Sequence, residues 1–335
     1  MNKEFQGVYA VAVTPFHKDG SFDLEAAKRH LDYLIENGVH GICILGATGE
    51  YQSVTLEEHK EYVREIVPYI CGRTSVIVGV TRERADDVIE LILQVKESGG
   101  HAAMVLAPPY CHPTQEELVE NYRYIMENTE FPIMVYNNPG SCGISIERDT
   151  FRELFGLPYT AVVKESSGDI HKVTEVVDDA PENVSVFCGA DNIALESFAA
   201  GVCGWISMLA NVAPKDCTAL FRAVYEEKNL EKGKEIYRRI LPALDVLETF
   251  PRVPQTLKYL LARKGLDCGY CRRPRVELTE EQKRALAVIK KGRDGLEVKS
   301  CDKVKALELL GKHLGIFTDK IEANVNDTTR SELQE

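Results

Sequence analysis

Short apolar runs alternate with amphipathic stretches from residue 8 to residue 207. The apolar runs are four to seven residues long, which is typical of buried strands and short for buried helices. Eight runs are predicted strands, at residues 8–14, 41–45, 75–80, 102–106, 133–136, 161–164, 185–188 and 204–207. The stretches between them carry apolar residues at helical spacing, and they predict helices at residues 23–37, 55–70, 85–98, 115–127, 146–155 and 170–180.

Two of these helices have a marked start. Thr55-Leu-Glu-Glu58 and Thr114-Gln-Glu-Glu117 both have the pattern of a capping box. Eight strand–helix units within about 210 residues predict an α/β fold, the (β/α)8 or TIM barrel. The alternative is a doubly wound sheet, which requires a glycine-rich phosphate turn after its first strand. The first strand here leads into Thr14-Pro15-Phe16, so we favour the barrel.

The pattern changes after the eighth strand. Helices are predicted at residues 213–228, 230–249, 254–264 and 279–291, with no strand between them. We therefore expect a barrel over residues 1–225 and a small helical C-terminal domain over residues 226–292. The segment 293–335 predicts an extra amphipathic helix at 303–314 and a disordered polar tail. That helix either packs on the barrel or a neighbour, or is a gene-fusion remnant with no role in the chemistry.

Composition narrows the class of protein. Apolar residues make up 44% of the 335 residues and charged residues 27%, as in soluble globular enzymes. A net charge of −12 disfavours nucleic acid or an anionic membrane as a partner, because both repel a negative field. No apolar run approaches the 18 or so residues of a membrane span. The first residues lack the apolar core of a secretion signal, so we expect a cytoplasmic protein.

Ten cysteines are scattered along the chain, and in a reducing compartment they are expected to be free thiols. Cys268 and Cys271 have CxxC spacing, but a zinc site would need a second pair, and none lies at a suitable distance. We favour two ordinary cysteines around a turn over metal or redox chemistry. No metal or other cofactor is expected.

The candidate chemistry lies where the predicted strands end, because side chains at the C-terminal ends of barrel strands share one pocket. Lys164 ends a buried apolar run, and burial disfavours its ammonium form. A free amine condenses with a ketone to form a Schiff base. Tyr136, at the end of the preceding strand, can transfer protons near that nitrogen, and Tyr110 can extend the relay towards solvent. Taken alone, Lys164 could be a solvent-reaching strand end and Tyr136 a strand cap.

The second strand ends in Gly46-Ala47-Thr48-Gly49. The two glycines allow backbone N–H groups to approach a small anion, and Thr48 adds a hydroxyl donor, so this stretch predicts a carboxylate site. Alone it would more often be an ordinary turn. The eighth strand, 204–207, ends on the same rim. This coincidence of unusual residues at one end of the barrel favours the catalytic interpretation.

Six stretches together carry a family resemblance. They lie at residues 7–16, 46–50, 108–113, 135–139, 163–168 and 204–207. In their order and spacing, from about residue 4 to 291, the chain resembles the dihydrodipicolinate synthase/N-acetylneuraminate lyase family of class I pyruvate aldolases. The resemblance implies a (β/α)8 barrel with a helical C-terminal domain, no cofactor, and a homotetramer or homodimer.

The same resemblance implies roles for single residues. Lys164 matches the Schiff-base lysine and Tyr136 the proton-transfer tyrosine. Gly46, Ala47, Thr48 and Gly49 match the stretch that binds the carboxylate of pyruvate or another 2-keto acid. Tyr110 matches a tyrosine donated to the neighbouring subunit's relay. Ile206, next to Ser207, matches a position whose carbonyl faces the pocket.

Two departures from the synthase pattern affect the expected substrate. Ala47 stands where synthases carry a hydroxyl residue, and Ser141 stands where they carry an arginine that binds the second substrate's carboxylate. The next arginine, Arg148, falls in the following predicted helix. Loss of a bidentate carboxylate clamp is costly for an acidic substrate. The loop after Lys164 also differs from that of sialic-acid lyases.

We therefore expect a Schiff-base lyase that breaks a C–C or C–O bond in a polyhydroxy or otherwise less acidic 2-keto compound. Two alternatives stay open. One is an authentic 4-hydroxy-tetrahydrodipicolinate synthase, which joins pyruvate to aspartate semialdehyde. The other is a barrel that binds 2-keto acids without catalysis.

Overall fold

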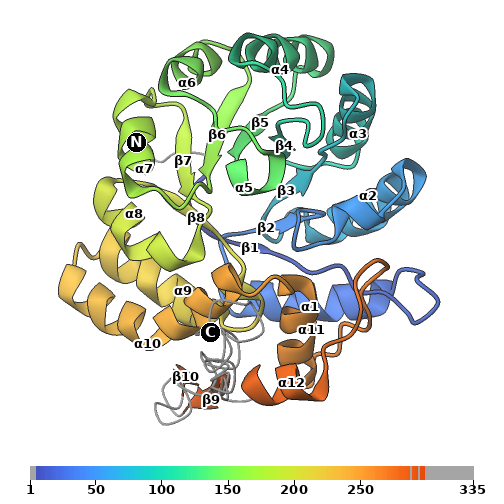
Figure 1. Ribbon diagram of the computed structural model, residues 1–335, viewed down its shortest axis with the longest axis vertical. Coiled ribbons are helices and arrows are strands. Elements are labelled where there is room, and N and C mark those ends of the chain that lie inside the picture. The colour runs from blue at the N-terminus through green and yellow to red at the C-terminus, as the bar shows by residue number, and fades with distance from the viewer. Residues whose placement is uncertain (1–4, 287–288, 293–294, 299–335) are drawn as a thin grey trace, which may run out of the picture.

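Eight parallel strands form a closed barrel in the computed structural model (Figure 1), which describes residues 5–286, 289–292 and 295–298. The strands are β1 (Gly7–Val11), β2 (Gly41–Ile44), β3 (Ser75–Gly79), β4 (Ala102–Leu106), β5 (Ile133–Asn137), β6 (Thr160–Glu165), β7 (Ser185–Cys188) and β8 (Gly204–Ser207). Each pairs with the next, and β8 closes the barrel against β1 with Tyr9 opposite Ile206. The predicted barrel is confirmed, and the doubly wound alternative is wrong.

Helices surround the barrel (Figure 1). They are α1 (Leu24–Glu36), α2 (Leu56–Ile70), α3 (Ala85–Glu97), α4 (Gln115–Thr129), α6 (Arg148–Phe155), α7 (Ile170–Asp179), α8 (Ala194–Ala200) and α9 (Pro214–Phe221). Both expected capping boxes are present, with Thr55 and Glu58 at the start of α2 and Thr114 and Glu117 at the start of α4. Because helices cover the outer face and side chains fill the interior, nearly every strand residue is buried.

The chain continues as a helical segment packed beside α8 and α9 (Figure 1). A π-helical turn (Arg222–Glu226) follows α9, and then come α10 (Leu230–Thr249), α11 (Val253–Ala262) and α12 (Glu280–Leu286). The stripe Ile236, Ile240, Leu244 and Leu247 buries one face of α10, which fixes this long helix against the barrel. The domain limits at 225 and 292 stay a prediction.

The end of this segment corrects the sequence analysis. The helix expected at 279–291 ends at Leu286, and β9 (Ile289–Gly292) pairs antiparallel with β10 (Gly295–Val298). The predicted C-terminal end of the last helix, at 291, was therefore wrong. β-Branched Ile289 and the flanking Gly292 both lower helix propensity, which favours ending the helix here. The helix expected at 303–314 and the tail after it lie outside the described residues.

One short helix was also not expected. The stretch after β5 folds into α5 (Pro139–Cys142), which starts with proline and is capped by the Asn138 side chain. Within the described ranges, no helix is both long and apolar enough to cross a bilayer.

Candidate active site

Lys164 and Tyr136 lie side by side at the C-terminal ends of β6 and β5. The two residues are register partners in the sheet, so their side chains point to the same face. Both are buried, with exposed fractions of 5% and 6%. Lys164 Nζ lies 4.0 Å from the centroid of the Tyr136 ring, which is within the range of a cation–π contact. The structure thus brings together Lys164 and Tyr136, the two main catalytic candidates from the sequence.

The Tyr136 hydroxyl has a fixed partner on its own loop. Asn138 Nδ2 donates a hydrogen bond of 2.6 Å to Tyr136 Oη. Because that bond uses a lone pair of the phenol oxygen, the phenol proton stays available for another acceptor. Asn138 also caps α5 through its Oδ1, so the short helix holds the group that orients the tyrosine.

Gly189 leaves the room that the lysine side chain occupies. It follows β7, and its N–H donates to Glu165 O at 2.7 Å. A Cβ at this position would lie 2.8 Å from Lys164 Cε and 1.8 Å from Ser166 Oγ. Those distances are far below van der Waals contact, so any side chain here would displace Lys164. The Ser166 hydroxyl is buried without a hydrogen-bond partner in the described chain, which leaves a free polar group beside the lysine.

The predicted carboxylate stretch, 46–49, follows β2 between two residues in left-handed backbone conformation. Leu45 has φ +52° and Glu50 has φ +61°, a conformation that costs a non-glycine residue about 1–3 kcal/mol. The Thr14 hydroxyl donates to Gly49 O at 2.7 Å. The Thr48 side chain is buried and makes no hydrogen bond within the described residues. A strained loop with a free hydroxyl fits a binding role.

The back of this loop packs on a glycine of β3. A Cβ on Gly79 would lie 2.3 Å from Leu45 O and 3.1 Å from Gly46 N, so only glycine lets the two backbones meet. Gly79 O in turn accepts a hydrogen bond of 2.8 Å from His59 Nε2 on α2. Burial lowers the pKa of His59 to about 4, which keeps the imidazole neutral near pH 7.

An acidic pair at the strand ends joins the loop after β7 to the C-terminal segment. Asp191, in the loop after β7, is fully buried, and its carboxylate accepts from Trp205 Nε1 and Leu209 N at 2.9 Å each. Its own N–H donates to Glu248 Oε1 on α10. Burial and the neighbouring Glu248 both raise the pKa of Asp191. Glu248 could not be predicted from the sequence, because nothing local signals that α10 reaches the barrel mouth.

Charge links Glu248 to the lysine. Burial raises the pKa of Glu248, while the Asp191 N–H and the Lys164 ammonium both lower it. The same cation affects Cys43 on β2. Burial raises the pKa of this thiol to about 11, and the charge of Lys164 opposes the rise. The Lys164 cation and the carboxyl group of α10 therefore influence each other electrostatically.

Tyr51 is a second residue that the sequence analysis missed. It starts the 3-10 turn after Glu50, and its N–H donates to Gly46 O at 3.4 Å. Burial raises the pKa of Tyr51 to about 12, and the Tyr136 phenol adds to the rise. Two phenols thus neighbour each other at the mouth. The only sequence signal was the position of Tyr51 directly after the glycine stretch.

The other predicted residues lie in different surroundings. Tyr110 is 85% exposed, and its hydroxyl makes no hydrogen bond in the part of the chain described. Its N–H donates to Glu83 Oε1 at 2.9 Å. Ile206 and Ser207 are buried in β8, where Ser207 Oγ accepts from Ala210 N at 3.1 Å. Within one chain, Tyr110 therefore lies in solvent, whereas Lys164 is buried.

The two departures from the synthase pattern are also visible. Ala47 lies half-buried beside Thr48, and Ser141 is exposed in α5. Arg148 does not replace the missing arginine, because its Nε donates to Asp179 Oδ2 at 2.6 Å on the outer helices. Among the described residues, no cluster of three His, Cys, Asp or Glu side chains could hold a metal. Cys268 and Cys271 are free thiols whose pKa burial raises to about 12.

Residues 4–292 match the Dihydrodipicolinate synthetase family. The chain belongs to this family. It is 33% identical over 286 residues to the 4-hydroxy-tetrahydrodipicolinate synthase of Methanocaldococcus jannaschii, a match that covers 84% of this chain and 96% of the relative. It is 32% identical over 282 residues to the enzyme of the same name from Methanococcus vannielii, covering 83% and 95%.

Solved structures of the family have the same fold. A putative dihydrodipicolinate synthetase from Pseudomonas aeruginosa superposes with a TM-score of 0.81 at 33% identity, over 84% of this chain and 97% of that one. A chloride-inhibited dihydrodipicolinate synthase from Acinetobacter baumannii, complexed with pyruvate, gives 0.79 at 30% identity, over 91% and 99%. Family membership makes the chain a class I, Schiff-base pyruvate aldolase.

Proposed function

We propose that this chain forms a Schiff base between Lys164 and a 2-keto acid, and that it cleaves or dehydrates a polyhydroxylated substrate rather than one with a second carboxylate. The position of Lys164 Nζ, 4.0 Å from the Tyr136 ring at the ends of adjacent strands, carries the first part. In this proposal Tyr136 is the acid/base, and Gly46, Ala47, Thr48 and Gly49 hold the substrate carboxylate.

The chemistry begins when the Lys164 amine adds to the ketone carbon of the 2-keto acid. Tyr136 protonates the resulting hydroxyl, water leaves, and a protonated imine forms. In an aldol cleavage, Tyr136 then takes the proton from the C4 hydroxyl, the C3–C4 bond breaks, and its electrons move into the imine to give an enamine. An aldehyde leaves, C3 is protonated, and water releases pyruvate and restores the lysine.

A dehydration uses the same imine. A proton leaves C3, and its electrons expel the C4 hydroxyl, which departs as water once protonated. Loss of the C3 proton from the imine gives an enamine, so the enamine and Tyr136 serve both reactions. The structure of the substrate determines which of the two reactions occurs. The N–H groups of the 46–49 stretch and the Thr48 hydroxyl would hold the carboxylate at C1 in either case.

Charge at the barrel mouth supports the choice of substrate. Ser141 brings no cation there, and Arg148 is paired with Asp179. Glu248, which accepts a hydrogen bond from Asp191 N, adds a carboxyl group at this end of the barrel. A second carboxylate on the substrate would face this acid without an arginine clamp, whereas hydroxyl groups can donate to it. A polyol tail therefore suits the site better than a charged one.

Reductive trapping tests the Schiff base. Borohydride added with pyruvate should place a stable pyruvate-derived mass on the peptide that contains Lys164. Lys164→Ala should give no adduct. Lys172→Ala is the matched control, because Lys172 donates to Ser145 Oγ and Ile146 O outside the site, and it should trap normally. An unlabelled wild-type peptide, or equal labelling in Lys164→Ala, would end the proposal and favour a non-catalytic binding protein.

The names of the relatives favour a second candidate, authentic 4-hydroxy-tetrahydrodipicolinate synthase. A coupled assay with pyruvate and aspartate semialdehyde separates the two. We expect a panel of 2-keto-3-deoxy sugar acids to release pyruvate, or to lose water, at a kcat/KM at least ten times that for the semialdehyde. The opposite ranking would assign the synthase reaction.

We also propose that the enzyme works in the cytoplasm as a homotetramer or homodimer. The free thiols of the described residues suit a reducing compartment. Tyr110, a large aromatic side chain that is 85% exposed, suits a surface covered by a second copy. Sedimentation at micromolar concentration checks this, and a monomer would contradict it.

A further inference from the structure

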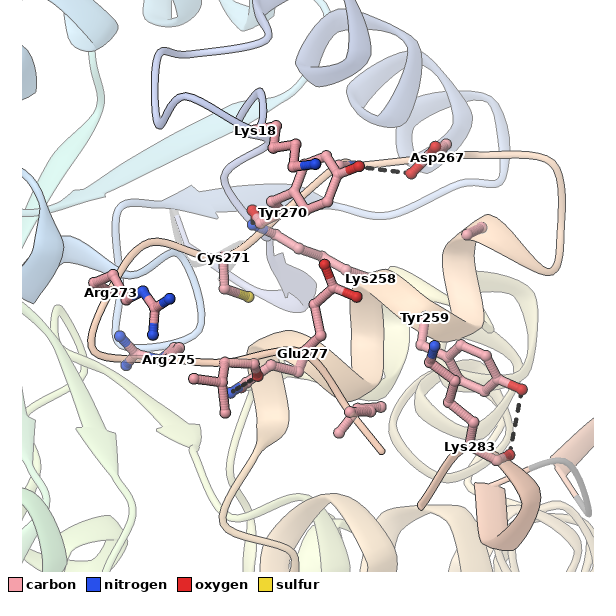
Figure 2. A pocket seen from close by; sticks show the side chains of 15 residues that line it. Lys18, Lys258, Tyr259, Asp267, Tyr270, Cys271, Arg273, Arg275, Glu277 and Lys283 are labelled. Carbon is pink, nitrogen blue, oxygen red and sulfur yellow. Dashed lines mark hydrogen bonds between the residues drawn. The ribbon is translucent and has the colours of Figure 1, made fainter. Parts of the chain in front are cut away.

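A cavity of about 490 Å³ lies outside the barrel mouth, between the loop at Lys18 and the C-terminal segment (Figure 2). Its volume is in the range of small-molecule sites. It is lined by residues of α11, of the stretch from Asp267 to Leu278, and by Lys283 of α12. No residue of the Lys164 site lines it.

The charge of the lining is positive, although the chain as a whole carries −12. Its cations are Lys18, Lys258, Arg273, Arg275 and Lys283, and its acids are Asp267 and Glu277. Lys18 and Arg273 have no carboxylate partner among the described residues. Because Lys283 is paired with Glu280 and Lys258 with Glu50, Lys18 and Arg273 are the cations that favour a bound anion most.

The walls also contain aromatic rings. Tyr259 and Tyr270 line the cavity, and Tyr259 is fixed by a hydrogen bond of 3.2 Å from its hydroxyl to Lys283 O. Figure 2 shows Arg273 and Arg275 at one side and Tyr259 with Lys283 at the other. Aromatic rings between cations bind a carbon skeleton better than a bare inorganic ion.

The floor of the cavity connects it to the catalytic loop. Lys258 lines the cavity and donates to Glu50 Oε1 at 2.8 Å, with both side chains almost fully buried. Arg275 lies 4.0 Å from the other oxygen of the same carboxylate. Glu50 directly follows Gly49 in the left-handed conformation described above. An anion that attracts Lys258 and Arg275 therefore weakens their ion pairing with Glu50, the residue that ends the 46–49 stretch.

We propose that this cavity binds a small organic polyanion bearing carboxylate or phosphate groups, and that the bound anion weakens 2-keto acid binding at Lys164. The binding half is independent of catalysis, while the coupling half rests on the proposed function. Because coupling between sites is reciprocal, pyruvate must weaken the anion by the same factor. We expect a factor of about five or more, with kcat changed less than KM.

Calorimetric titration of the full-length protein with citrate and with pyrophosphate, at fixed ionic strength, tests the binding. The wild type should bind at least one of them saturably at millimolar concentration or below. Lys18→Ala/Arg273→Ala should bind about tenfold or more weakly, because both cations are removed. Arg123→Ala/Lys234→Ala is the matched control, since it removes the same charges from exposed sites on α4 and α10, and it should bind like the wild type.

Each outcome has a meaning. If citrate binds more tightly than pyrophosphate, the ligand of the cavity is a polycarboxylate. If pyrophosphate binds more tightly, the ligand is a phosphate compound. Absence of saturation with either anion, or equal loss in both double variants, overturns the site. If Lys18→Ala/Arg273→Ala folds poorly, Lys18→Glu alone must still weaken binding. Citrate binding with no effect on pyruvate trapping overturns the coupling, whereas citrate binding with no trapping under any condition overturns only the proposed catalysis.

Discussion

Among single residues, the site depends on some that take no part in the reaction but hold the reactive ones in position. Lys164 and Tyr136 are reactive residue types, and their positions at strand ends could be predicted from the apolar runs before them. Gly189 could not, because its importance lies only in what a side chain there would touch. Asn138 was visible as part of a turn, but its bond to the Tyr136 hydroxyl becomes apparent only once α5 has formed.

Gly189→Ala should impair imine formation without unfolding the barrel. The added methyl group would lie 2.8 Å from Lys164 Cε and 1.8 Å from Ser166 Oγ, so both must move. Misplacement of a nucleophile by about 1 Å costs about 10²-fold in rate. Rapid-mixing borohydride trapping measures that rate, and circular dichroism checks the fold. Gly156→Ala, whose nearest contact is Glu153 O at 3.2 Å, is the control and should react normally.

Substrate choice should also change through two residues. Ala47→Thr/Ser141→Arg restores the hydroxyl and the cation that the synthase pattern carries at these positions. We expect turnover of aspartate semialdehyde to rise about tenfold or more, since a carboxylate clamp contributes about 1.5–3 kcal/mol. Initial rates with both substrates measure this. Ser141→Gln, similar in length but neutral, should give no such rise, and a rise there would contradict the role of charge.

At the scale of elements, the loops at the barrel mouth are held from behind by helices. His59 of α2 binds Gly79 O, and Gly79 in turn supports the start of the 46–49 stretch. The helix starts were predictable, because Thr55 and Thr114 cap them with local contacts. The hairpin of β9 and β10 was not, because its strands are only four residues each and are defined by their pairing with one another.

Two buried histidines should make stability depend on acid pH. Burial lowers the pKa of both His30 and His59 to about 4, whereas the unfolded chain titrates near 6.5. Their contribution is therefore complete above pH 6.5 and is lost as the pH falls towards 4. Each shift corresponds to about 3 kcal/mol.

Urea unfolding of the wild type and of His59→Gln, between pH 7.5 and about 4.5, measures this dependence. Glutamine can still donate to Gly79 O, but it cannot be protonated. We expect the variant to lose less free energy of unfolding than the wild type over that range. Identical losses would mean that His59 does not titrate on unfolding. His112→Gln, which changes a histidine outside the core, is the control.

At the scale of the whole molecule, the C-terminal segment completes the site although it supplies no nucleophile. Lys258 on α11 neutralises Glu50, 208 residues earlier in the chain, and Glu248 on α10 reaches the strand ends. The barrel itself was predictable because each strand and helix has its own periodic pattern. These contacts were not, since no sequence pattern joins residues so far apart.

The Glu50–Lys258 pair should show strong coupling in a double-mutant cycle. Lys258→Met should destabilise the protein by up to about 3–5 kcal/mol, because it leaves the buried Glu50 carboxylate with only the more distant Arg275 as a counter-charge. Adding Glu50→Gln should recover a large part of that loss. Thermal or urea unfolding measures stability, and pyruvate trapping shows whether the loop still binds. If the losses in free energy of unfolding of the two single variants add up to that of the double variant, the two charges do not interact.

The Glu50–Lys258 pair also affects when the site can form during protein synthesis on the ribosome. At about 5–20 residues per second, the 208 residues between Glu50 and Lys258 take the ribosome about 10–40 s to add. During that interval the nascent chain comes to contain Gly46, Tyr136 and Lys164, yet the carboxylate next to the substrate loop has no partner. A stalled chain that ends before α11 would carry every reactive group of the enzyme but would lack the cation that pairs with Glu50. The buried ion pair at the end of the substrate loop can therefore form only when the chain is nearly finished.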